Sequence, residues 1–89
     1  MAEQRWQRAD HWVGAEFEDS LVMVEVELGT YVGLNDTAAA VWEVIEHPVT
    51  RDDIVSYLRA RFDVPVDHCA SAVIATLDRF RDVGLAVAV

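Results

Sequence analysis

The sequence predicts an α+β fold, in which a three-stranded antiparallel sheet is followed by three helices. Apolar and polar residues alternate between residues 12 and 34, which is the period of a half-buried strand. From residue 36 onward, apolar residues recur every three or four positions, as in a helix with one buried side. The change falls within residues 31–42, where Asn35 and Asp36 are suited to cap a helix.

Composition restricts the classes of protein to consider. The chain has 89 residues, 53% of them apolar, which is enough for the core of one small domain. It carries 16 acidic residues against 7 arginines and no lysine, for a formal net charge of −9. Nucleic acid and anionic membranes are therefore unfavourable partners, because both would be repelled. A lone Cys69 and an N-terminus without the apolar core of a secretion signal predict a cytoplasmic protein.

The strands are expected in the first part of a domain that spans residues 12–89, after a flexible arm at residues 1–11. The first strand covers residues 12–18 and the second covers residues 22–28, after turn residues at Asp19 and Ser20. The third strand, residues 30–34, comes last in the meander and is expected at the sheet edge. The alternation predicts one buried face made of Val13, Ala15, Phe17, Val22, Val24, Val26 and Leu28, and a wet face that includes the glutamates.

The helices are expected in the second half of the chain. The first covers residues 36–46 and ends before Pro48, because the residue that precedes a proline is pushed out of the helical region. The second begins with a capping box of Thr50 and Asp53. Asp67 is expected to cap the third helix, and Gly84 is expected to end it in the left-handed conformation.

Two further features concern the packing of this second half. The buried stripe of the third helix is expected to consist of Ala70, Val73, Ile74, Leu77 and Phe80. Residues 85–89 form an apolar tail that is either a last strand packed on the core or an exposed end. The sequence leaves both possibilities open.

No constellation for catalysis or metal binding is evident in the sequence. Asp67, His68 and Cys69 are consecutive, and consecutive helical residues point about 100° apart, so they do not face one metal ion. Asp67 is better explained as a cap, His68 as an exposed residue, and Cys69 as a small buried hydrophobe. His11 and His47 belong to no motif. We therefore expect a protein that is not an enzyme and that carries no cofactor and no metal.

The predicted edge strand is the feature that favours a binding function. Edge strands expose unpaired N–H and C=O groups, which proteins usually protect with charged residues or proline. Residues 30–34 contain neither, so this edge can accept another chain as an added strand. Two alternatives remain open, namely that the arm at residues 1–11 covers the edge, or that the edge pairs in a homodimer.

Three segments together resemble the PqqD-like family. That family includes the peptide chaperone of pyrroloquinoline quinone biosynthesis, here called the quinone-pathway chaperone. It also includes the precursor-peptide recognition elements of ribosomally made, post-translationally modified peptides, among them lasso peptides. The three segments are residues 29–42, residues 49–58, and residues 72–80 followed by Gly84 and Leu85. The most specific part is Leu34-Asn35 followed by Thr37-Ala38-Ala39, with Trp42 further along the helix. The resemblance covers residues 12–86 and implies a winged-helix-like arrangement of the sheet and helices.

The resemblance also implies a function and a site. Family members bind the leader region of a precursor peptide as an extra strand and deliver it to a modifying enzyme in trans, such as a leader peptidase or a radical SAM enzyme. The third strand and the third helix would form the groove. The implied peptide-binding residues are Thr30, Tyr31, Val32, Gly33, Leu34, Val73, Ile74, Leu77, Asp78 and Arg81. The alternative is a winged-helix DNA-binding transcriptional regulator, which the negative charge disfavours.

Overall fold

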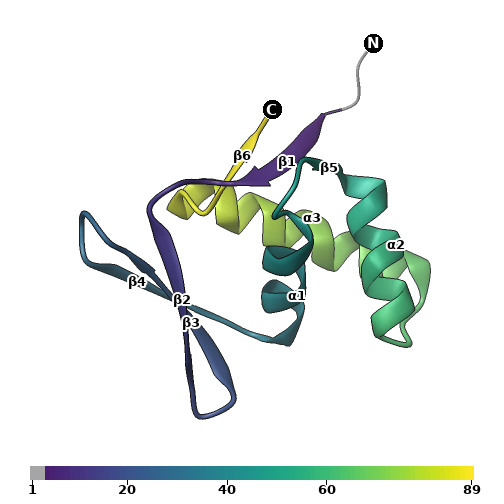
Figure 1. The fold of residues 1–89 in the computed structure, drawn as a ribbon. Coiled ribbons are helices and arrows are strands. Elements are labelled where there is room, and N and C mark those ends of the chain that lie inside the picture. The colour runs from purple at the N-terminus through teal and green to yellow at the C-terminus, as the bar shows by residue number, and fades with distance from the viewer. Residues whose placement is uncertain (1–3) are drawn as a thin grey trace.

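The structure, a computed structural model, describes residues 4–89 and contains three helices and two small antiparallel sheets (Figure 1). The elements in chain order are β1 (Arg5–Arg8), β2 (Trp12–Phe17), β3 (Ser20–Glu25), β4 (Thr30–Leu34), α1 (Asp36–Val44), β5 (Val49–Thr50), α2 (Arg51–Arg61), α3 (Val66–Val83) and β6 (Ala86–Ala88). One sheet has the order β2-β3-β4 and the other has the order β5-β1-β6. The predicted class, an antiparallel sheet followed by three helices, is confirmed, whereas the second sheet was not predicted.

The second sheet corrects the expectation of a flexible N-terminal arm. Within residues 1–11, Arg5–Arg8 forms β1, which pairs with β5 on one side and with β6 on the other. Trp6 on this strand is only 6% exposed and belongs to the core. The partners of β1 lie far along the chain, so no local period marks it as a strand. Residues 1–3 of the predicted arm lie outside the described residues. The apolar tail forms β6, which resolves the alternative left open for it.

Tight turns join the strands of the β2-β3-β4 sheet. Glu18 and Asp19 both have positive φ, of 49° and 66°, and form the two-residue turn between β2 and β3, one residue earlier than predicted. The strand β3 ends at Glu25 and does not continue to residue 28. The buried Glu25 carboxylate accepts hydrogen bonds from the N–H groups of Glu27 (3.1 Å) and Leu28 (2.7 Å), so it holds the turn that leads into β4.

The burial of this sheet is the reverse of the predicted one. Met23, Val32 and Leu34 face the helices and are nearly or fully buried. Val13 and Phe17 lie on the opposite face and are 52% and 68% exposed. The alternation in the sequence is real, but both faces carry apolar residues. Contact with the helices, which no local pattern encodes, decides which face becomes the core.

Local capping chemistry fixes most helix ends as predicted. The Asn35 side chain accepts a hydrogen bond from the Ala38 N–H at 2.8 Å and begins α1. Thr50 and Asp53 form both bonds of the capping box of α2. Gly84 ends α3 with φ of 85°, in the left-handed region. The prediction for Asp67 is wrong, because the N-cap residue of α3 is Pro65, two residues earlier, and no side chain caps this helix.

The core lies between the inner face of the β2-β3-β4 sheet and the three helices. On α3, Val73, Leu77 and Phe80 are buried as predicted, but Ile74 is 42% exposed and falls outside the core. Phe80 meets Trp42 of α1 edge to face, with the ring centroids 6.5 Å apart. This contact joins α3 to the helix that follows β4, and so fixes α3 relative to the sheet.

A surface ion pair joins α1 to α2. The Arg61 guanidinium bonds to the Glu43 carboxylate and holds the pKa of that carboxyl below its usual range. The Tyr57 hydroxyl donates a second hydrogen bond to the same carboxylate at 3.2 Å. Both charged side chains are about half exposed, so the pair orients the two helices more than it stabilises them.

The two α3 residues Leu77 and Ile74 give a matched test of this packing. Leu77→Ala should lower the free energy of unfolding by about 2 to 5 kcal/mol, because Leu77 is 2% exposed and its loss leaves a cavity. Ile74→Ala should lower it by less than about 1 kcal/mol, because Ile74 is already 42% exposed. Urea denaturation measures both values. Equal losses would contradict the position of α3 in the core.

Candidate functional site

The β2-β3-β4 sheet ends in an open strand, β4. Its residues pair with β3 on one side, from Thr30 opposite Glu25 to Leu34 opposite Leu21. Within the described residues no strand pairs with its other side. The strand therefore lies at the sheet edge, as predicted. It carries neither a charged residue nor a proline, so its free backbone groups are accessible to another chain.

The N-terminal segment does not cover this edge. Arg5–Arg8 is held by β5 and β6, in the other sheet. Arg8 adds a hydrogen bond from its Nε to the Trp42 carbonyl at 2.8 Å, and its guanidinium lies 4.5 Å from the Trp42 ring centroid. Ala9 continues the attachment with an N–H bond to the Leu85 carbonyl. Of the two alternatives for the edge, coverage by the described part of the arm is thus excluded.

The five predicted residues of β4 divide between two sides of the sheet. Val32 and Leu34 point into the core and are 8% and 5% exposed. Tyr31 and Gly33 lie on the outer face, and Tyr31 is 73% exposed. Because successive strand residues alternate, an added strand would follow the same alternation. Its side chains would point inward at every second position and outward at the others.

A hollow of about 350 Å³ opens at the beginning of β4, beneath the inner side of the sheet. Trp12 forms part of its wall, and its indole Nε1 donates a hydrogen bond to the Gly84 carbonyl at 2.9 Å. Thr30 of β4 and Val83 of α3 both line this hollow, so the end of α3 and the beginning of β4 share one concave surface. The hollow is lined by Asp10, His11, Trp12, Glu25, Glu27, Leu28, Thr30, Val83 and Gly84.

The helix α3 presents two different flanks beside its buried stripe. Residues at spacings of three, four and seven lie on one side of a helix. Ile74, Asp78 and Arg81 share one side, which we call the Ile74 flank, and Asp78 and Arg81 form an exposed ion pair at 3.4 Å. The residues Thr76, Arg79 and Val83 share the opposite side, which we call the Val83 flank. Val83 is the α3 side chain that meets the hollow at β4.

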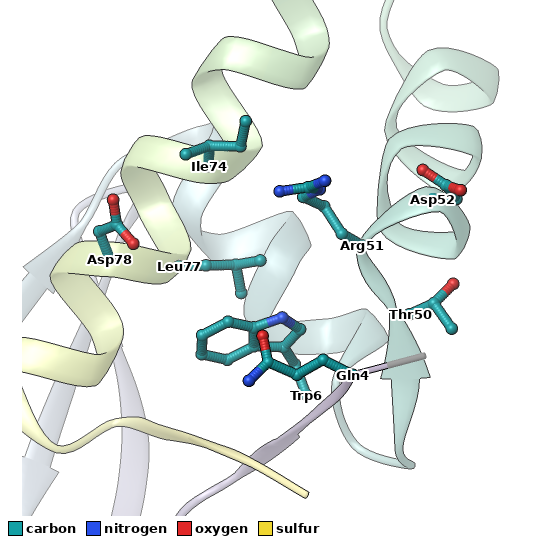
Figure 2. Close-up of a pocket in the computed structure, with 8 residues that line it drawn as sticks. All are labelled: Gln4, Trp6, Thr50, Arg51, Asp52, Ile74, Leu77 and Asp78. Carbon is teal, nitrogen blue, oxygen red and sulfur yellow. The ribbon is translucent and has the colours of Figure 1, made fainter. Parts of the chain in front are cut away.

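The Ile74 flank faces a second hollow, of about 220 Å³. Figure 2 shows Ile74, Leu77 and Asp78 on one side of it and Arg51 extending toward them from α2. The Trp6 indole forms the floor. The described lining residues come from or next to β1, β5, α2 and α3, and none comes from β4. The structure therefore does not bring the predicted residues Ile74 and Asp78 to the β4 edge.

The residues of the predicted site thus lie in three different parts of the structure. Val73 and Leu77 are core residues, Ile74, Asp78 and Arg81 belong to the Ile74 flank, and the β4 residues lie at the open edge. Trp12 and Val83 beside that edge were missed in the sequence. Both lie next to Gly84: Val83 precedes it in the sequence, and Trp12 donates a hydrogen bond to its carbonyl. The contact between Trp12 and Gly84 spans most of the chain, so no local sequence pattern reveals it.

The described residues contain no group of three or more side chains that could hold a metal ion. Cys69 is buried and its thiol points to the Val55 carbonyl at 3.8 Å, which matches the expected role of a small buried hydrophobe. His68 is exposed, as expected. Among residues 4–89 no helix has the length and apolar character needed to cross a bilayer.

Comparison with known proteins gives one family and two related folds. The family model of coenzyme PQQ synthesis protein D (PqqD) matches residues 20–86. A solved structure of TbiB1 in complex with the TbiA(beta) leader peptide has a TM-score of 0.77 and 22% identity, over 90% of this chain and 93% of that one. A lasso peptide synthetase B1 complexed with the leader peptide has a TM-score of 0.74 and 23% identity, over 97% of this chain and 99% of that one.

No curated protein sequence matches this chain. At these identities the two solved structures establish the fold. The family match spans most of the chain, and the protein belongs to the PqqD family.

Proposed function

We propose that this member of the PqqD family binds the leader segment of a ribosomally made precursor peptide and presents it to a modifying enzyme that acts in trans. The observation that carries the proposal is the open edge of β4, which lies beside the hollow at Thr30 and Val83. Both solved structures of similar fold are complexes with a leader peptide, which supports the same class of ligand.

Strand addition to β4 explains how one site accepts a peptide. The free N–H and C=O groups along Thr30–Leu34 supply hydrogen bonds that do not depend on the side chains of the ligand. Selectivity then comes from the leader side chains that point inward, toward the hollow and α3. A segment of about five residues matches the length of β4.

The wall opposite β4 is best assigned to the Val83 flank of α3. Val83 is 40% exposed and lines the same hollow as Thr30. Thr76 and Arg79 continue this flank along the helix. The sequence prediction named Ile74, Asp78 and Arg81 for the same wall, and their flank faces Trp6 and Arg51 instead.

The chain contributes binding and its partner contributes the chemistry. The candidate site consists of backbone groups and mainly apolar or neutral side chains, which suits recognition of a peptide. A leader peptidase or another enzyme of a lasso peptide pathway is the partner class we favour. The segment after α1 contains His47 and Pro48, where the quinone-pathway chaperone often carries Asp-Gly, so that pathway fits less well.

The charge of the chain opposes the DNA-binding alternative. In a winged-helix regulator, α3 would enter the major groove. It exposes Asp78 and Asp82 beside Arg79 and Arg81, on a chain with a net charge of −9. Affinity for DNA depends largely on cationic contacts with phosphates, so this surface is unsuited to it.

Backbone methylation of the leader tests strand addition without altering the protein. In a strand added to a sheet edge, whether antiparallel or parallel, alternate residues direct their N–H groups to the partner strand. N-methylation at every second position of the bound segment should therefore weaken binding by at least about tenfold, and the neighbouring positions should change it little. Calorimetry with the leader of the precursor encoded beside this gene gives the affinities.

This design avoids a difficulty with substitution in β4. Val32→Pro would also remove an N–H group, but Val32 is 8% exposed, so the variant would disturb the core as well. Weakening without alternation along the leader would contradict the added strand.

The two flanks of α3 offer a matched pair of variants. Val83 and Ile74 are 40% and 42% exposed, on opposite flanks of the same helix. Val83→Ser should weaken leader binding by about tenfold through lost apolar contact, whereas Ile74→Ser should leave it within about twofold. Circular dichroism confirms folding of both variants. The reverse order of affinities would show that the leader lies against the Ile74 flank.

A further inference from the structure

One end of the candidate site differs from the rest because it carries negative charge. The hollow at the beginning of β4 is lined by three carboxylates, those of Asp10, Glu25 and Glu27. Among the described residues that line it there is no arginine, and the chain has no lysine. The lining residue that can become cationic is His11, whose Nδ1 lies 3.6 Å from a Glu27 carboxylate oxygen and which is charged only when protonated. The hollow therefore lacks a permanent positive charge.

Glu25 is the carboxylate in this hollow that is buried. It is only 8% exposed, and its two oxygens accept one hydrogen bond each, from the N–H groups of Glu27 and Leu28. Each oxygen can accept a further hydrogen bond. Within residues 4–89 no ion pair joins Glu25 to a cationic side chain. Charged groups at this depth are usually paired, so the missing positive charge points to a ligand that supplies it.

Much of the remaining wall is apolar. Leu28 and Val83 are 81% and 40% exposed, and both line the hollow together with Trp12. Lys and Arg side chains bury their methylene stems along apolar surface while their charged ends stay in polar surroundings. A neutral apolar side chain would cover the same wall but leave the carboxylates without a cationic partner. A basic side chain therefore matches both parts of the lining.

The register of an added strand would direct one leader side chain into this hollow. Val32 and Leu34 point inward, and Thr30 lies on the same face because strand residues two apart share a face. Residues directly opposite each other on neighbouring strands also share a face. The leader residue opposite Thr30 would thus point inward, at the place where Thr30 lines the hollow.

We propose that this hollow selects a Lys or Arg side chain of the leader, at the position opposite Thr30. The inference rests on the proposed leader binding and specifies the class of leader that the chain accepts, namely one with a basic residue at one end of its bound segment. The methylene stem packs against the apolar wall, and the charged end lies among the three carboxylates. The net charge of −9 also attracts such a leader from a distance.

Neutral analogues of the leader test the charge without altering the protein. The probe is a synthetic leader of the precursor encoded beside this gene, in which each Lys is replaced in turn by norleucine and each Arg by citrulline. Both replacements keep the stem and remove the charge. Calorimetry should show one position at which the replacement weakens binding by at least about tenfold, and the other basic positions should change it by less than about threefold.

A pair of double variants separates the hollow from the charge of the whole chain. Asp10→Asn with Glu27→Gln removes two carboxylates from the hollow and keeps Glu25, which holds the turn. Glu16→Gln with Asp19→Asn is the matched control, because it changes the net charge equally at the far end of the same sheet. All four replaced side chains belong to exposed residues.

The variants and the analogues together form a thermodynamic cycle. The hollow variant should weaken binding of the unmodified leader by at least about fivefold, and the control variant should change it by less than about twofold. The leader neutralised at the selected position should bind the hollow variant and the wild type within about twofold, because the charge that the hollow recognises is already absent. Circular dichroism checks the folding of both variants. NMR of the wild-type complex should show contacts between the stem of the basic residue and the Val83 methyl groups.

The outcomes distinguish this inference from the proposed function. If no basic position has this effect while leader binding still shifts the β4 amides, the selection of a basic residue is overturned and leader binding stands. Equal weakening by the two double variants would also overturn it, since the attraction would then come from the whole chain. A wild-type chain that binds no leader in calorimetry would reject the proposed function, and this inference with it.

Discussion

The pairing of β1 between β5 and β6 is the constraint on which the rest of the structure depends. It ties the N-terminal segment to the C-terminal strand and buries Trp6 against the core. Arg8 reinforces the attachment by bonding to the Trp42 carbonyl. Because both ends of the described chain are used in this second sheet, neither lies along β4. The open edge at which the leader is proposed to bind is therefore a consequence of where the termini pair.

The two faces of the β2-β3-β4 sheet differ in their surroundings. The inner face, with Met23 and Val32, provides the packing that holds α3 in place. The outer face carries apolar residues that contribute little to that core. Between them, the β4 backbone offers hydrogen bonds that any extended peptide can use. The proposed leader strand would thus bind along the edge where the two faces meet.

Features set by neighbours in the sequence could be predicted, and features set by distant contacts could not. Asn35, the Thr50 and Asp53 capping box, and Gly84 act within a few residues, and their predicted roles are confirmed. The strand β1 depends on partners at the far end of the chain. The burial of Met23 in place of Val24 depends on helix packing, since apolar residues occupy both faces. The open β4 edge was predicted from the sequence, whereas the α3 flank that lies beside it could be identified only in the structure.

The most direct measurement of the central claim is the detection of contacts between the leader and β4 by NMR, with isotope-labelled chain and unlabelled leader peptide. Strand addition predicts backbone proton contacts between the leader and Thr30–Leu34 in an antiparallel or parallel ladder, together with saturable shifts at Val83. Contacts confined to the hollow at Trp6 and Ile74, with β4 amides unshifted at saturation, would contradict it.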